Sequence, residues 1–284
     1  SAREALEGLA GRDGFEDAAC RVLETYYGEN ENWFDLVRIK QAQFGRMDDP
    51  YERQTVLRSM ATIQEDRLGN GAGAFESLAS ALGEAGCEGE VIGELDRLAV
   101  GLGSFERLAE LYEQAIERGS NEELHLPMHR RLARLYEAHF SAPYRAVAHW
   151  DEVLAMEDFD SEALGRLDHL HTVERNWKPL TEVLRRRIDV GENGQVNVTR
   201  ARLGRLLEVV HADVAGAIDM HRTVLSEDPT HQASTIELER LVMQPGVREE
   251  IAEILEPLYR DADLSSKLSV LQELRIETTE DPMD

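Results

Sequence analysis

Trp33-Phe34-Asp35-Leu36 is the first of four related segments, which return at Phe105-Glu106-Arg107-Leu108, Trp177-Lys178-Pro179-Leu180 and Arg248-Glu249-Glu250-Ile251. Their first residues are 72, 72 and 71 positions apart, and the same register aligns Leu23, Leu95, Leu167 and Leu238. A single central core gives no reason for such repetition. A stack of repeats does, because each unit buries its apolar face against its neighbours. The sequence therefore predicts a solenoid.

Each unit has the pattern of four helices. Residues 177–190, for example, are apolar at helical spacing, at Trp177, Leu180, Val183, Leu184 and Ile188. No strand-like alternation of useful length occurs. We expect an all-α chain of about 16 helices that forms one repeat domain over residues 1–284. Its parts are a half unit (1–31), three full units (32–103, 104–175 and 176–246) and a partial unit with a polar tail from Glu277 (247–284).

The composition limits the kinds of partner. The chain of 284 residues carries 56 acidic and 31 basic residues, which gives a formal net charge of −25. Nucleic acid and anionic membranes both require a positive surface, so we expect neither as a partner. The acidity itself has three interpretations: solubility, a basic partner, or a GC-rich or salt-adapted source, since only three of the basic residues are lysine.

The two cysteines, Cys20 and Cys87, are too few for a disulfide framework or a metal site, so we expect both to be reduced and structural. No stretch approaches the ~18 apolar residues of a membrane span. The sequence opens with Ser1, midway through a unit, which favours a fragment of a longer protein. A signal or anchor would then lie outside it, and a cytoplasmic location is the default expectation.

The second and third helices of each unit resemble the tetratricopeptide repeat. In the third unit, Arg202-Leu203-Gly204-Arg205-Leu206-Leu207-Glu208 is followed by Ala217-Ile218, Val224-Leu225 and Asp228-Pro229, which is the order of residues in that family. Small residues on both helices let the backbones approach, and the pairs are Ala61 with Ala74, Ala133 with Ala146 and Gly204 with Ala217. The resemblance implies a right-handed superhelix of antiparallel helix pairs. It also implies that a protein or peptide binds a concave groove lined by the first helix of each pair.

The candidate groove residues lie on these first helices, on the face that packing does not use: Arg58, Arg130, Arg134 and Arg205, with Glu65, Glu137 and Glu208. A row of arginines can bind carboxylates in two-pronged fashion. The structural alternative is that Arg134–Glu137 and Arg205–Glu208 form i,i+3 pairs within their own helices, each adding only ~0.2–0.5 kcal/mol, or that these charges bridge successive repeats.

No motif in the sequence indicates catalysis. His125 and His129 are four apart but match no closed metal site, and Gly69-Asn70-Gly71-Ala72-Gly73 lacks the following lysine of a phosphate loop. Nucleophile and metalloprotease motifs are also missing. We therefore expect no cofactor, no metal and no enzymatic activity.

Large aromatic residues open three of the units, at Trp33, Phe105 and Trp177. At helical spacing such residues more often pack against the preceding helix than bind a ligand. Trp150 stands alone in the register, and we expect it to be partly exposed.

These observations favour a non-enzymatic scaffold that binds a protein or peptide. Two alternatives remain open. One is a structural spacer that self-associates through its open repeat ends, and the other is a regulatory region of a larger enzyme. A coherent charged or apolar stripe along the groove would favour the scaffold, whereas arginine and glutamate paired with one another would favour the spacer.

Overall fold

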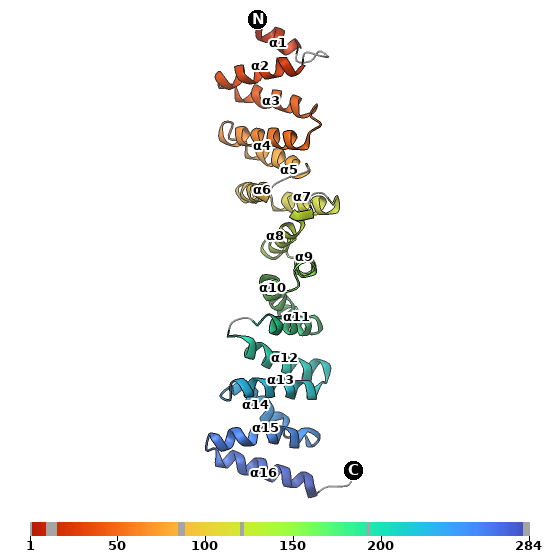
Figure 1. Ribbon diagram of the computed structural model, residues 1–284, viewed down its shortest axis with the longest axis vertical. Helices are drawn as coiled ribbons and strands as arrows, with labels where there is room; N and C mark the ends of the chain where they lie inside the picture. Colours follow the sequence, from red (N-terminus) through yellow and green to blue (C-terminus); the bar gives the residue numbers. More distant parts are fainter. Residues whose placement is uncertain (1, 10–15, 85–88, 120–121, 192–193, 281–284) are drawn as a thin grey trace. The chain divides into compact units, whose positions relative to one another are not determined.

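The structure is a computed structural model that describes residues 2–9, 16–84, 89–119, 122–191 and 194–280. Within these ranges it contains sixteen α-helices, two short 3-10 turns (Glu122–Leu124 and Pro245–Val247) and no strand (Figure 1). The all-α fold with about 16 helices is therefore confirmed. The chain divides into two compact units, residues 1–152 and 153–284. That residues 1–284 form one domain stays a prediction.

The first unit is built from the helices α1 to α9: α1 (Ala2–Leu9), α2 (Glu16–Glu29), α3 (Trp33–Phe44), α4 (Pro50–Asp66), α5 (Gly71–Leu82), α6 (Gly89–Leu102), α7 (Phe105–Glu117), α8 (His125–Ala138) and α9 (Pro143–Met156). The second unit continues from the end of α9 with α10 (Ser161–Val173), α11 (Trp177–Val190), α12 (Val196–His211), α13 (Val214–Glu227), α14 (Gln232–Leu241), α15 (Arg248–Asp261) and α16 (Ser265–Glu280). α16 extends to Glu280, past Glu277, where the sequence suggested that a tail begins.

The repeat of four helices is confirmed by the positions at which the helices begin. α3, α7, α11 and α15 begin at Trp33, Phe105, Trp177 and Arg248, at the intervals found in the sequence. Within each unit, consecutive helices pack side by side, and the pairs α4–α5 and α12–α13 are in the most extensive contact (Figure 1).

A recurring turn places a large aromatic residue at the start of α3, α7 and α11. One residue before each helix cap is left-handed: Glu31, Gly103 and Arg175 have φ of 55°, 66° and 57°. The cap residue that follows donates its backbone N–H to a carbonyl five residues earlier, in the pairs Asn32–Tyr27, Ser104–Ala99 and Asn176–His171. Only one of these left-handed positions is glycine, although the conformation costs other residues roughly 1–2 kcal/mol. The turn therefore holds the aromatic residue at the same place in each of these repeats.

The small residues that the sequence pairs across the helix hairpins are all buried, as expected for close helix packing. The detail differs at Gly204 on α12. A Cβ atom built there would meet His221 and Met220 before any atom of Ala217. The side chains of Met220 and His221, one turn further along α13 than Ala217, are therefore closest to Gly204.

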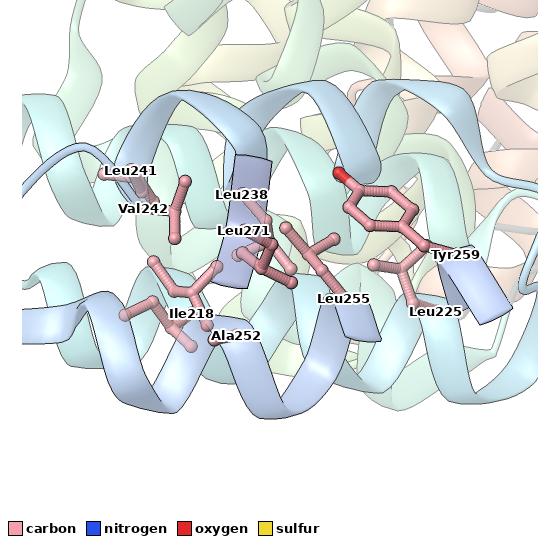
Figure 2. Packing of buried hydrophobic residues seen from close by; sticks show 10 residues of the cluster. Ile218, Leu225, Leu238, Leu241, Val242, Ala252, Leu255, Tyr259 and Leu271 are labelled. Carbon is pink, nitrogen blue, oxygen red and sulfur yellow. The ribbon is translucent and has the colours of Figure 1, made fainter. Parts of the chain in front are cut away.

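The interior of each unit is aliphatic. In the second unit one cluster joins α13, α14, α15 and α16 through ten buried side chains, among them Ile218, Leu238, Leu255 and Leu271 (Figure 2). Leucine and alanine dominate such clusters because helices approach closely where side chains are small or flexible. Stacking of consecutive helices thus supplies the core, with no separate central layer.

The expectation for Trp150 is wrong. Its side chain is fully buried, with no exposed surface, and its Nε1–H donates to Oε1 of Glu137 at 2.6 Å. A buried indole requires an acceptor for its N–H group, and the carboxylate on α8 supplies it. Cys20 is buried and not bonded to another cysteine; Cys87 lies outside the described residues.

Candidate interaction grooves

Ion pairs sort the helices of each unit into two rows. Side chains on even-numbered helices bind the next even-numbered helix, in the pairs Arg58–Glu90, Arg97–Glu65, Arg131–Asp96, Arg202–Asp168, Arg205–Glu237, Arg240–Glu208 and Lys267–Glu239. Odd-numbered helices are joined in the same way, for example by Arg107–Glu76 and Arg145–Glu113. Most partners are 26 to 35 residues apart in the chain, which is the spacing of every second helix. The even row is the face on which the predicted groove residues lie.

An acidic residue recurs at one position of the even row, at Glu24, Asp96, Asp168 and Glu239. Each acid accepts from a side chain of the next helix: Lys40, Tyr112, Arg187 and Tyr259, respectively. Three of them also bind the next even helix, through Arg131, Arg202 and Lys267. One carboxylate thus ties three helices together in three of the repeats.

Asp168 shows the electrostatics of this position most clearly. Its side chain is only 7% exposed, and Arg202 donates to both of its oxygens, from Nη2 at 2.7 Å and from Nη1 at 2.8 Å. Burial on its own raises the pKa of Asp168. The hydrogen bonds and charge of Arg202, together with Arg187, more than offset burial and hold the pKa below its ordinary value. At Asp96 the second partner is the neutral hydroxyl of Tyr112, whose pKa is raised by burial first and then by the charge of Asp96.

Beside this carboxylate, two grooves occupy equivalent places in the two units. In unit 1 the α7 groove has a volume of about 280 Å³ and is lined by Asp96, Val100, Phe105, Leu108, Arg131, Arg134, Leu135, Ala138 and His139. In unit 2 the α11 groove has a volume of about 640 Å³ and is lined by Thr172, Trp177, Leu180, Arg202, Arg205, Leu206, Val209 and Val210. Every residue of the α11 groove is the register equivalent of one in the α7 groove. The repeat therefore builds the same groove twice, with different side chains.

The aromatic residue of each groove faces one further side chain, at a place we call the cover position: Arg67, His139 and Val210 in the successive repeats. In the first repeat the Arg67 guanidinium lies 5.1 Å from the centre of the Trp33 ring. In the second, His139 stacks on Phe105 with ring centres 3.6 Å apart and planes 12° from parallel. In the third, the cover position is Val210, and Trp177 is 37% exposed. Two aromatic residues are thus covered by a planar polar group, and the third is bordered by an aliphatic one.

The predicted groove residues are distributed unevenly over this surface. Arg134 and Arg205 occupy equivalent places in the two grooves. Arg58 pairs with Glu90 at 3.0 Å on α6 and does not line either groove, and the half-buried Arg130 does not line them either. The Glu65 carboxylate accepts hydrogen bonds from both terminal nitrogens of Arg97, at 2.6 and 2.7 Å. Glu208 pairs with Arg240, and Glu137 binds Trp150.

These pairings bear on the alternatives that the sequence left open. Arg205 binds Glu237 and Glu208 binds Arg240, so these charges bridge helices of successive hairpins. Exposed pairs of this kind contribute about 0–1 kcal/mol each. The arginines do not form an uninterrupted positive stripe, and their pairing with glutamate is the pattern that would favour the spacer. The apolar walls of the grooves, rather than an arginine row, are the feature most suited to binding.

Two further features recur at the 72-residue register of the sequence and mark this surface. One is the acid at Glu24, Asp96, Asp168 and Glu239. The other is the cover position, where arginine, histidine and valine succeed one another. Neither follows the apolar pattern by which the repeats are recognised.

A second polar cluster lies between α8 and α9. Nδ1 of His129 and Nδ1 of His149 are 3.0 Å apart, and the His149 ring stacks on Tyr136, with its plane 6° from parallel. Burial lowers the pKa of both histidines, and His129 lowers that of His149 further. Among the described residues no group of three or more His, Cys, Asp or Glu side chains is arranged to hold a metal ion. No helix in the described ranges has the length and apolar character of a membrane span.

The sequence matches no family model and no curated protein. The solved structures with a similar arrangement of helices include two tetratricopeptide repeat proteins. The fold is similar to the C-terminal part of a TPR repeat-containing protein from Cytophaga hutchinsonii, at 9% identity over 92% of this chain and 95% of that one, with a TM-score of 0.39. It is also similar to a tetratricopeptide repeat protein from Parabacteroides merdae, at 16% identity, 97% and 99% coverage and a TM-score of 0.35. Human IFIT1 in a structure with m7Gppp-AAAA matches at 14% identity, 100% and 68% coverage and a TM-score of 0.35. Similarity of this extent concerns the arrangement of helices only and gives no information about binding partners.

Proposed function

We propose that this chain is a non-enzymatic scaffold that binds a protein or peptide along the even row of helices. The observation that supports the proposal is the α11 groove, an apolar hollow bounded by Arg202 and Arg205 that recurs in register as the α7 groove. Grooves with apolar walls and a few polar groups at the edge are typical of binding sites. A chain that served only as a spacer would need neither groove.

A protein partner is favoured over nucleic acid by charge. The formal net charge is −25, and the arginines of the even row are already engaged with carboxylates. Binding to a phosphate backbone requires several positive contacts that release counterions. We therefore expect a single-stranded RNA oligonucleotide not to bind at physiological salt.

The test is the affinity of a partner captured from the source cells and identified. The double variant Arg134→Glu/Arg205→Glu reverses one charge at the edge of each groove. An exposed residue of the odd row, Tyr144, supplies the control variant Tyr144→Glu, since its side chain is 74% exposed. We expect the groove variant to bind at least ten-fold more weakly and the control to bind as the unchanged chain does, with circular dichroism showing that both are folded. Equal affinity of all three proteins would refute binding on the even row and favour the spacer.

A further inference from the structure

Three differences separate the α11 groove from the α7 groove, although the register makes them equivalent. The α11 groove is larger, about 640 against 280 Å³. Volumes of ~300–1,000 Å³ are usual for sites that enclose a ligand group; the α11 groove lies well within this range, and the α7 groove lies at its lower edge. The other two differences concern the cover position and the charge of the edge.

The residue at the cover position determines whether the aromatic face of the groove is covered by another side chain of the same protein. His139 lies flat against Phe105 in the α7 groove, with ring centres 3.6 Å apart, and so occupies the aromatic face. Val210 in the α11 groove has no ring to stack, and Trp177 keeps 37% of its surface exposed. An indole face is the largest apolar surface that a side chain can offer to another apolar or aromatic group. The α11 groove therefore leaves an aromatic face open to a ligand, whereas His139 covers the corresponding face in the α7 groove.

The charge at the edge also distinguishes the α11 groove, where the arginine is less fully compensated by its carboxylate. Asp96 faces one guanidinium, that of Arg131, and the neutral hydroxyl of Tyr112. Asp168 is shared between two guanidinium groups, those of Arg187 and Arg202, so its single charge compensates Arg202 only in part. Arg202 is 41% exposed, and its bonds to Asp168 and Thr172 use three of the five N–H donors of a guanidinium. The edge of the α11 groove is thus suited to a second carboxylate.

We propose that the α11 groove is the recognition site of this chain and that it takes a peptide segment in which a large apolar side chain stands next to an aspartate or glutamate. This inference rests on the scaffold function proposed above and names its ligand. The apolar side chain lies on Trp177 between Leu206 and Val209, and the neighbouring carboxylate accepts from Arg202. The α7 groove does not bind such a segment because His139 already covers the face of Phe105.

The experiment uses the full chain and a phage-displayed library of random 12-residue peptides. We expect the enriched sequences to share a Trp, Phe or Leu within two residues of an Asp or Glu. A synthetic peptide with this consensus should bind with one site per chain and shift the emission of Trp177, a shift that Trp177→Phe abolishes. Replacing the acid of the peptide by its amide should weaken binding about ten-fold or more. Enrichment of basic peptides, or of none, overturns the inference.

Two exchanges at the cover position test the comparison of the grooves directly. Val210→His introduces the stacking side chain and should weaken binding of the consensus peptide at least ten-fold, whereas Ile236→His at an exposed place on α14 should not. His139→Val removes the stack and should raise the stoichiometry from one site to two. If Val210→His leaves peptide binding unchanged but Arg134→Glu/Arg205→Glu weakens it, the scaffold function stands and the proposal for this site is refuted. If neither Val210→His nor the double arginine variant changes binding, both proposals are refuted.

Discussion

Gly204 on α12 lies directly against the imidazole of His221 on α13. A methyl group at 204 would come within 2.9 Å of Nε2 of His221 and 3.2 Å of Cβ of Met220. The imidazole is not free to move away, because it is 1% exposed and its Nδ1 lies 3.1 Å from Oγ of the buried Ser234. The equivalent pair in the first full repeat is Ala61 with Leu78. The glycine and the histidine therefore fit each other as a pair.

Gly204→Ala should destabilise the chain even though alanine is the better helix former by about 1 kcal/mol. The overlap with His221 should cost roughly 1–3 kcal/mol, which outweighs that gain. The variant His221→Leu should relieve the overlap, since alanine opposite leucine already packs at Ala61 and Leu78. In urea unfolding followed by circular dichroism, we expect the double variant to be more stable than the sum of the single effects by about 0.5–3 kcal/mol. Effects that add within ~0.5 kcal/mol would show that the two sites are independent.

Ala133→Leu should also destabilise the chain. Ala133 on α8 and Ala146 on α9 both have 0% exposed surface, so the additional methylene and methyl groups have no space. Overpacking of this kind costs ~1–3 kcal/mol. Ala148 on the same α9 is exposed and provides the matched control, because Ala148→Leu adds the same atoms in solvent. A melting temperature for Ala133→Leu equal to that of Ala148→Leu would contradict the helix pairing.

The His129–His149 pair should make stability fall as the pH falls below about 6.5. Burial lowers the pKa of both groups in the folded chain, so the unfolded chain binds more protons in this window. The two Nδ1 atoms, 3.0 Å apart, share one proton, and a second proton would place two N–H donors against each other. The charged or titratable groups near the pair are His125, Glu152, Glu113 and Arg145.

The measurement is the melting temperature between pH 7.5 and 5. His129→Leu/His149→Met carries the residues found at the equivalent places Leu57 and Met220. We expect this double variant to lose part of the pH dependence in the window. His221 also contributes, because its pKa is also lowered, chiefly by burial. If the double variant followed the same pH curve as the unchanged chain, the pair would not be a source of the dependence.

Asp168→Asn should weaken unit 2 at neutral pH and reduce its sensitivity to acid. The pKa of Asp168 is lowered in the folded chain, so its contribution is present above the ordinary carboxyl pKa and is lost as the pH falls through the folded value. An amide leaves the guanidinium groups of Arg187 and Arg202 without their shared charge, at a cost of roughly 1–3 kcal/mol. Asp189→Asn, at an exposed position of α11, is the control. Unfolding in urea at pH 7 and at pH 3, below the ordinary carboxyl pKa of about 3.9, gives the answer, and equal losses for the two variants would refute the contact that Asp168 makes with both arginines.

The sequence was sufficient for the fold because the information is local and repeated. The aromatic residues at Trp33, Phe105 and Trp177 mark the helix starts, and the small residues mark the hairpins. It was less informative about partners on the even row. Arg205 and Glu208 are neighbours on one helix, which suggests an internal pair, yet each binds a residue 32 positions ahead. Which partner each side chain binds depends on the distance between neighbouring helices, and the periodicity of the sequence gives no information about that distance.

The same limit explains Trp150 and the grooves. Trp150 has no aromatic counterpart in the other repeats, which suggested exposure, but Glu137 accepts its N–H and permits burial. The walls of each groove come from three consecutive helices, and the residues of one groove recur 71 or 72 positions later in the other. Their shape becomes visible only when the cover position and the aromatic residue are placed in contact.

The cover position also means that stacking and recognition are set by different residues. Arg67, His139 and Val210 lie outside the buried cores, so an exchange there changes the groove surface and leaves the apolar residues that pack the helices unchanged. A chain of this design can acquire, silence or relocate a binding site through a single substitution. Repeats that share one architecture can in this way present different surfaces.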